Sequence, residues 1–125
     1  MARRKHPADS LLQFALTLPE AWADLPWEED LVAKVGKKVF VFFGSATRPK
    51  AMGVKLPRSA PYALSLACCE PAGYGLGRSG WVTVRCDEPD TPSVDVLHDW
   101  ILESYCAVGP KRLTRQLEES GRRGR

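Results

Sequence analysis

Short runs of alternating apolar and polar residues occupy the middle of the chain and predict β-strands. Leu31–Val35 and Val39–Phe43 are separated by a turn at Gly36-Lys37-Lys38, and a polar turn at 44–49 leads into a third run, Lys50–Leu56. Three antiparallel strands joined by short turns are the simplest structure for this pattern. Pro57 ends the third strand because proline cannot donate to a sheet ladder.

The clearest strand is Trp81–Cys86, in which Val82, Val84 and Cys86 alternate with polar or aromatic neighbours. One face of this strand is therefore expected to enter the core. The strand at 39–43 differs, because both of its faces are apolar. Either a helix or loop covers its second face, or aromatic side chains lie exposed among lysines; the pattern leaves both alternatives open.

Helical patterns flank these strands. Asp9 is placed to cap a helix over 10–18 that Pro19 ends, and a loop rich in proline and tryptophan follows. Residues 60–69 predict a second helix. A third is expected from Thr91-Pro92-Ser93, with apolar residues at helical spacing as far as Gly109, and a further amphipathic turn or two at 111–119.

These elements predict an α+β fold: a single-domain, two-layer arrangement with an antiparallel sheet of about 4–5 strands and helices packed on one face. The 125 residues suffice for one domain. We expect it to span 9–119, between disordered basic tails at 1–8 and 120–125. With 44% hydrophobic and 26% charged residues and no apolar run near the ~20 residues of a membrane helix, the expected location is the cytoplasm.

Charge is divided sharply along the chain. Residues 32–86 contain nine bases and one acid, whereas 9–30 and 87–103 contain six acids each and no base, within a net charge of only +3. Such division creates local potentials that attract a polyanion to one part of the surface. The residues expected to contact phosphates, from turns and from the polar side of the strands, are Lys34, Lys37, Lys38, Arg48, Lys50, Lys55, Arg78 and Arg85.

The pattern does not favour a metal, redox or cofactor site. Cys68, Cys69, Cys86 and Cys106 lack the two-residue spacer of zinc and redox motifs, so reduced, structural thiols are expected. The segment Gly75–Gly80 matches the glycine pattern of dinucleotide-binding loops. That chemistry needs a helix after the glycines, whereas here a strand follows, so a flexible loop with Arg78 at its tip and no cofactor is expected.

The sequence pattern does not favour a catalytic site either. His98 is the candidate base, but its acidic neighbours Asp95, Asp99 and Glu103 indicate a solvated helix face. The thiols of Cys68 and Cys69 have no adjacent cation to lower their pKa. We therefore expect a protein that is not an enzyme.

A set of segments occurs in a fixed order along the chain: Leu18–Ala21, Ala33–Phe40, Gly53–Leu56, Gly73-Tyr74, Leu76–Val84, Glu103–Tyr105 and Pro110–Leu113. In this order the segments resemble the MmcQ/YjbR family of small bacterial proteins, and the resemblance covers about 11–117. It implies a CyaY-like α+β fold and DNA binding through a double-wing arrangement of hairpins. Glu20 departs from the glycine expected after Leu18-Pro19. Trp81 and Tyr105 are expected to pack in the core, because large aromatic side chains dominate core energetics.

The leading hypothesis is a non-enzymatic DNA-binding protein of low sequence specificity. The alternative is a protein-interaction or adaptor domain whose basic face meets an acidic partner. A third hypothesis is an enzyme or a small-ligand protein that uses the 70–80 loop, with a pocket lined by Tyr74, Trp81 and His98. We expect a monomer or a weak dimer, since the acidic segments attract the basic block of a second copy.

Overall fold

The computed structural model describes residues 7–24, 30–45, 51–73, 76–86 and 88–123, with side chains over 11–24, 31–43, 51–73, 76–86 and 88–117. None of the helices in these ranges is both long and apolar enough to cross a bilayer. The elements in chain order are α1 (Pro7–Leu16), β1 (Ala21–Asp24), β2 (Asp30–Val35), β3 (Lys38–Ser45), β4 (Ala51–Lys55), α2 (Ala60–Leu64), β5 (Cys69–Pro71), the 3₁₀ helix η1 (Leu76–Ser79), β6 (Trp81–Arg85), α3 (Val94–Val108) and α4 (Lys111–Arg123).

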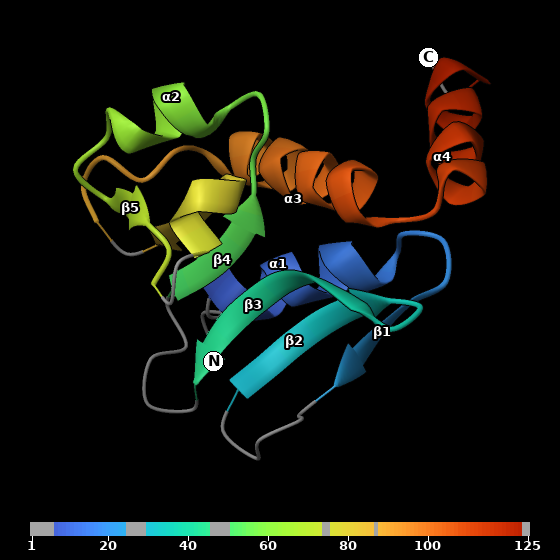
Figure 1. Cartoon of the computed structure of the whole chain (residues 1–125), viewed down its shortest axis with the longest axis horizontal. Coiled ribbons are helices and arrows are strands. Elements are labelled where there is room, and N and C mark those ends of the chain that lie inside the picture. The colour runs from blue at the N-terminus through green and yellow to red at the C-terminus, as the bar shows by residue number, and fades with distance from the viewer. Residues whose placement is uncertain (1–6, 25–29, 46–50, 74–75, 87, 124–125) are drawn as a thin grey trace, which may run out of the picture.

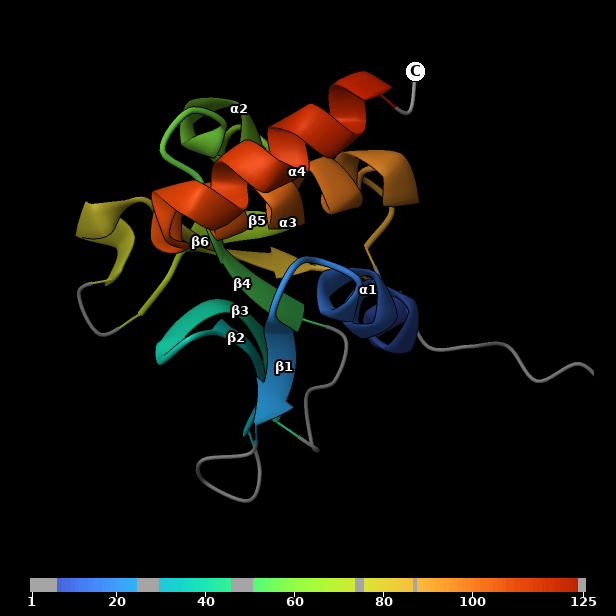
Figure 2. The ribbon, with the colours of Figure 1, turned by 90° about the vertical axis from the view of Figure 1, so that its right-hand side faces the viewer.

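The strands form one antiparallel sheet in the order β1-β2-β3-β4-β6-β5. Helices gather on one side of this curved sheet, as Figures 1 and 2 show. Between the layers lies a core to which α1, α3 and most strands contribute buried side chains, including Leu11, Val54, Val82 and Ile101. The predicted two-layer α+β fold is therefore confirmed. Six strands form the sheet where the sequence predicted about four or five.

An irregularity in β3 explains why both of its faces are apolar. Ala33 pairs with Val41 and Lys34 pairs with Val39, so β3 advances two residues where β2 advances one. Phe40 is the extra residue of this bulge, and a bulge breaks the strict alternation of side chains. As a result Phe40 and its neighbour Val41 are both buried in the core, while Phe42 is directed to the opposite face and is only partly buried.

A serine from α3 completes the sheet beside this bulge. The β3–β4 register pairs Val41 with Val54, and its continuation would place Phe40 opposite Lys55. Between these two residues stands the hydroxyl of Ser104, which accepts from the Lys55 N–H at 2.8 Å and donates to the Phe40 carbonyl at 2.5 Å. Ser104 is fully buried. Its side chain therefore satisfies two backbone groups that water does not reach.

The residues on either side of Ser104 fix two further segments. The Glu103 carboxylate accepts from the Arg58 and Ser59 N–H groups at 2.8 and 3.0 Å, and from the Ser59 hydroxyl at 2.6 Å. On the other side, the Tyr105 hydroxyl donates to the Pro19 carbonyl at 2.7 Å, and its buried ring meets Phe40 edge-on. Successive helical residues point about 100° apart, so three adjacent side chains reach α2, the sheet and the α1–β1 turn.

Several element boundaries differ from the predictions. The first helix begins at Pro7, so Asp9 lies inside it and is not its cap. Two short edge strands, β1 and β5, were missed because propensity is weak over three or four residues in segments rich in proline or tryptophan. Helix α2 ends at Leu64, well before Cys69, and α4 continues to Arg123, past the expected end of the domain at 119.

Glu20 has a left-handed backbone, with φ of 58°. This conformation suits glycine and costs other residues about 1 kcal/mol or more, which explains why glycine is expected at this position. Here the side chain forms a bidentate pair with Arg112 of α4, at 2.9 and 3.2 Å. The pair connects the turn before β1 to the start of α4.

Replacing Ser104 with alanine is expected to destabilise the protein by about 2–4 kcal/mol, because two buried backbone groups lose their partner. Urea unfolding measures the loss, and amide hydrogen exchange should show the Lys55 N–H becoming less protected. Ala107→Ser, an exposed position on the same helix, is the matched control and should change stability by only a few tenths of a kcal/mol. Equal stability of Ser104→Ala and the wild type would contradict the bridging role.

Candidate functional site

The sheet topology brings several predicted phosphate contacts to one end of the sheet. The β2–β3 turn carries Lys37 and Lys38; because β4 runs antiparallel to β3, its last residue, Lys55, lies toward that end. Trp81 pairs with Lys55, so Arg78, just before β6, also lies there. We call this region the basic end. Among the described residues, no ion pair engages any of these four cations.

The fold adds cations that the sequence analysis did not single out. Arg58 follows β4 directly and is exposed. The end of α3 lies against β2, since a Cβ at Gly109 would lie 3.6 Å from Val35. The chain turns there into α4, which projects from the body in Figure 1 and begins with exposed Lys111. The antiparallel strands place Arg58, and the packing of α3 on β2 places Lys111, at the same end of the sheet as Lys37.

The acids at the basic end are engaged, among the residues whose side chains are described. Glu20 is held by Arg112, whose hydrogen bond and charge lower its pKa. Glu103 is buried; desolvation alone would raise its pKa, but hydrogen bonds from Ser59 and Arg58 and the charge of Arg58 outweigh that effect and lower it. Both carboxylates therefore stay ionised near neutral pH, yet neither points freely toward the exposed lysines.

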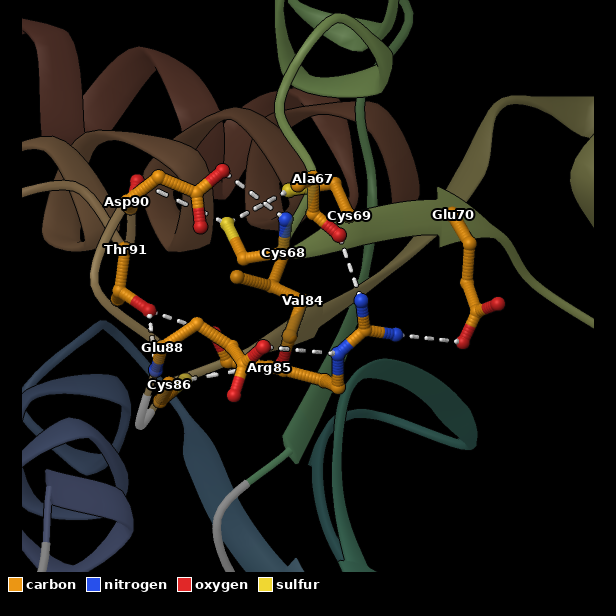
Figure 3. A network of polar contacts seen from close by, with 10 residues as sticks. All are labelled: Ala67, Cys68, Cys69, Glu70, Val84, Arg85, Cys86, Glu88, Asp90 and Thr91. Atoms are coloured by element: carbon orange, nitrogen blue, oxygen red, sulfur yellow. Dashed lines mark hydrogen bonds and ion pairs between the residues drawn. The ribbon is translucent and has the colours of Figure 1, made fainter.

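Arg85 lies at the opposite end of β6, within a polar network (Figure 3). Its guanidinium lies 3.2 Å from Glu70 and 4.0 Å from Glu88, and it donates to the Ala67 carbonyl. The Arg85 carbonyl accepts from the hydroxyl of Thr91 at 2.8 Å. These contacts join β6, β5 and the segment before α3, so Arg85 supports this corner and its charge is balanced by two acids.

Lys34 is also paired. Its ammonium lies 2.7 Å from Asp24 and 5.2 Å from the centroid of the Trp22 ring, with 19% of the side chain exposed. The indole N–H of Trp22 donates to the Gly36 carbonyl at 3.0 Å and so fixes the ring beside the β2–β3 turn. Arg48 and Lys50 lie outside the described residues.

The predicted small-ligand site does not assemble. Trp81 lies on the side of the sheet that faces away from the helices, in edge contact with Phe42, and not in the core as expected. His98 stacks on Phe14 of α1 at 3.9 Å, so it faces a helix and not solvent, and its buried Nε2 has no hydrogen-bond partner among the described residues. The two side chains are on opposite sides of the sheet, and Tyr74 lies outside the described residues.

Three of the four cysteines are small buried side chains. Cys68, Cys69 and Cys86 are buried, Cys106 is exposed, and none of the four forms a disulfide. Burial raises the pKa of the Cys69 thiol to about 12, and its contact with Cys68, at 3.6 Å between the sulfurs, adds to the rise. Such a thiol is a poor nucleophile at neutral pH. Within the described residues, no three His, Cys, Asp or Glu side chains are grouped to hold a metal ion.

Comparison with known proteins identifies the family. The family model of YjbR matches residues 16–107, so the chain belongs to the YjbR family, as its sequence segments suggested. No curated protein matches the chain. The crystal structure of Deinococcus radiodurans protein DR2400, which carries a DUF419 domain, is similar with a TM-score of 0.70 and 24% identity, over 88% of this chain and 86% of that one. This likeness concerns the fold.

Glu103→Gln tests the buried carboxylate at the basic end. Because folding lowers the pKa of Glu103 below its ordinary 4.5, its ionic contribution is fully present above that pH and is lost as pH falls through the folded-state pKa. We expect the variant to be less stable than the wild type at pH 7 by about 2 kcal/mol. This difference in the free energy of unfolding should become smaller as the pH is lowered. Urea unfolding from pH 7 to pH 3 measures both quantities.

The control for this comparison is Glu70→Gln, whose exposed carboxylate pairs with Arg85. An exposed ion pair contributes little to stability, so this variant should have nearly the same free energy of unfolding as the wild type at every pH from 7 to 3. A gap for Glu103→Gln that stays constant down to pH 3 would show that the charge of Glu103 is not what matters.

Proposed function

We propose that this YjbR-family protein is a non-enzymatic DNA-binding protein that contacts phosphates with its basic end. The observation that supports the proposal is that five exposed cations and the partly exposed Lys55, none with a described ion pair, gather at one end of the sheet. The residues proposed to contact phosphates are Lys37, Lys38, Lys55, Arg58, Arg78 and Lys111. Lysine and arginine side chains at turns reach phosphate oxygens, and each neutralised phosphate releases counterions.

Charge at the other end supports one direction of approach. The acids around the start of α3 lie beyond the far end of β6, where Arg85 is already paired with Glu70 and Glu88. Asp95 and Asp99 are exposed there. A polyanion is repelled from this end and attracted to the basic end, so the molecule is oriented before contact.

The proposal includes low sequence specificity. Phosphate contacts set affinity and orientation but carry no base information. The β2–β3 hairpin would lie along the DNA backbone as a wing, in keeping with the double-wing arrangement that the family resemblance implies. A cytoplasmic location is part of the same proposal, and no catalytic step is assigned.

Neutralising the β2–β3 turn with Lys37→Gln and Lys38→Gln should weaken binding to every DNA sequence alike, roughly tenfold or more at moderate salt. If each lysine neutralises one phosphate, the slope of log affinity against log salt should become shallower by about 0.9 per lysine. Fluorescence anisotropy with two unrelated 20-base-pair duplexes at four salt concentrations measures both effects.

A quadruple variant separates local charge from net charge. Adding Asp95→Asn and Asp99→Asn restores the native net charge of +3 but leaves the turn neutral. The proposal expects this variant to bind as weakly as the double variant. Recovery of native affinity would show that only overall charge matters, and absence of binding by the wild type at low salt would overturn the proposal.

A further inference from the structure

The sheet face that points away from the helices carries aromatic side chains together with cations. Val54, Val82 and Val84 are buried against the helices, so the residues that alternate with them in β4 and β6 lie on the other face. We call this the open face. Its members among the described residues are Trp22, Asp24, Val32, Lys34, Val39, Phe42, Ala51, Gly53, Lys55, Glu70, Trp81, Thr83 and Arg85. Asp24 pairs with Lys34 and Glu70 with Arg85, and Val32 is fully buried.

The register arranges these residues in two adjacent rows. In one row Phe42 pairs with Gly53, and Gly53 with Thr83. In the other, Trp22 pairs with Lys34 and Lys34 with Val39 on one side of the bulge, and Lys55 pairs with Trp81 on the other side. The rows meet where the Phe42 and Trp81 rings touch edge to face, with centroids 5.4 Å apart.

Glycine at position 53 lets the Phe42 ring lie close to the sheet. Gly53 stands between Phe42 and Thr83, and a Cβ at Gly53 would contact Phe42 at 3.5 Å, which is ordinary van der Waals distance. A larger residue here would lie against the Phe42 ring. With glycine, the ring and its neighbour Trp81 remain partly exposed in the middle of the sheet.

We propose that the open face binds single-stranded nucleic acid, with bases against Phe42 and Trp81 and phosphates held by Lys55 and the basic end. This inference rests on the proposed function. Aromatic rings on a sheet stack on the flat faces of bases, which only an unpaired strand presents. Lys34 and Arg85 are paired with acids, so the charge for the strand comes from Lys55, which lies next to Trp81, and from the basic end beyond it.

The geometry suits a short stretch of strand. From Trp22 in β1 to Trp81 in β6 the open face spans five adjacent strands, or about 19 Å at the usual strand spacing. That length accommodates roughly four nucleotides or somewhat more, at the lower end of the site sizes of single-strand modules. Lys55 belongs to both surfaces, because it is paired with Trp81 on the open face and lies at the basic end.

The first measurement compares a 20-nucleotide oligothymidine with a duplex of equal length by fluorescence anisotropy at the same salt. Charge alone favours the duplex, because its phosphates are denser. The proposal expects the opposite order, with the single strand bound at least tenfold more tightly. Binding should also quench tryptophan fluorescence, and Trp81→Phe should reduce that quenching.

Thr83 offers a pair of variants with opposite expected effects. It is partly exposed in the row beside Phe42 and Gly53. Thr83→Glu should weaken oligothymidine binding about tenfold, and Thr83→Lys should strengthen it about threefold, as expected for one charge placed beside a phosphate. Ala107→Glu and Ala107→Lys, exposed on α3, are the matched controls and should have effects near unity.

The outcomes separate the two proposals. If the duplex binds as tightly as the single strand and the Thr83 variants match their Ala107 controls, the open face is not the binding surface, and the proposed DNA binding through the basic end still stands. If neither nucleic acid binds at low salt, both proposals fail. A Thr83→Glu variant that unfolds is recognised by circular dichroism, and Thr83→Lys then decides.

Discussion

The hydroxyl of Ser104 lies where two strands of the sheet separate, and the arrangement of both proposed binding surfaces depends on it. A bulge at Phe40 lets β3 curve, but it also removes Lys55 from the backbone partner that a regular ladder would provide. Ser104 supplies the missing acceptor and donor from α3. Since a buried, unpaired N–H or carbonyl costs about 1–3 kcal/mol, a hydroxyl at this position lowers the energetic cost of the curvature.

The two neighbours of Ser104 extend the same principle to the rest of the fold. Glu103 fixes the segment that carries Arg58, and Tyr105 fixes the turn that precedes β1. Both segments border the basic end, so one helical turn of α3 determines where cations from β4 and from the neighbouring turns are held. Glu103 also shows how a buried acid is compatible with a cationic surface: its charge is satisfied by N–H groups and is not directed outward.

The sequence predicted the fold class for physical reasons that can be named. Val82 and Val84 alternate with polar or aromatic residues without interruption, so the pattern alone predicted which face of β6 enters the core. The Val39–Phe43 run was ambiguous because a bulge leaves no local signature; it depends on Ser104, about sixty residues away along the chain. Trp81 was expected in the core on the basis of size, but its alternation with Val82 places it on the open face.

Charge was less predictable than fold. Composition identified the basic middle of the chain, yet Lys34 and Arg85 are balanced by Asp24 and Glu70, partners that no sequence spacing indicates. Lys111 and Arg58, in contrast, join Lys37 only through the topology of strands and helices. A run of like charges in the sequence therefore predicts whether a surface is basic or acidic. Strand pairing then determines which of the charged side chains form ion pairs and which remain available to a ligand.

The bulge connects the two surfaces. In a regular strand Phe42 and Phe40 would share one face; the extra residue turns Phe40 into the core against Tyr105 and leaves Phe42 on the open face beside Trp81. The same irregularity ends close β3–β4 pairing near Lys55, so this lysine lies where the open face meets the basic end. Stability and proposed binding thus depend on one local departure from regular β-structure. The bulge that requires Ser104 for its backbone groups also places the Phe42 ring against Trp81, the neighbour of Lys55.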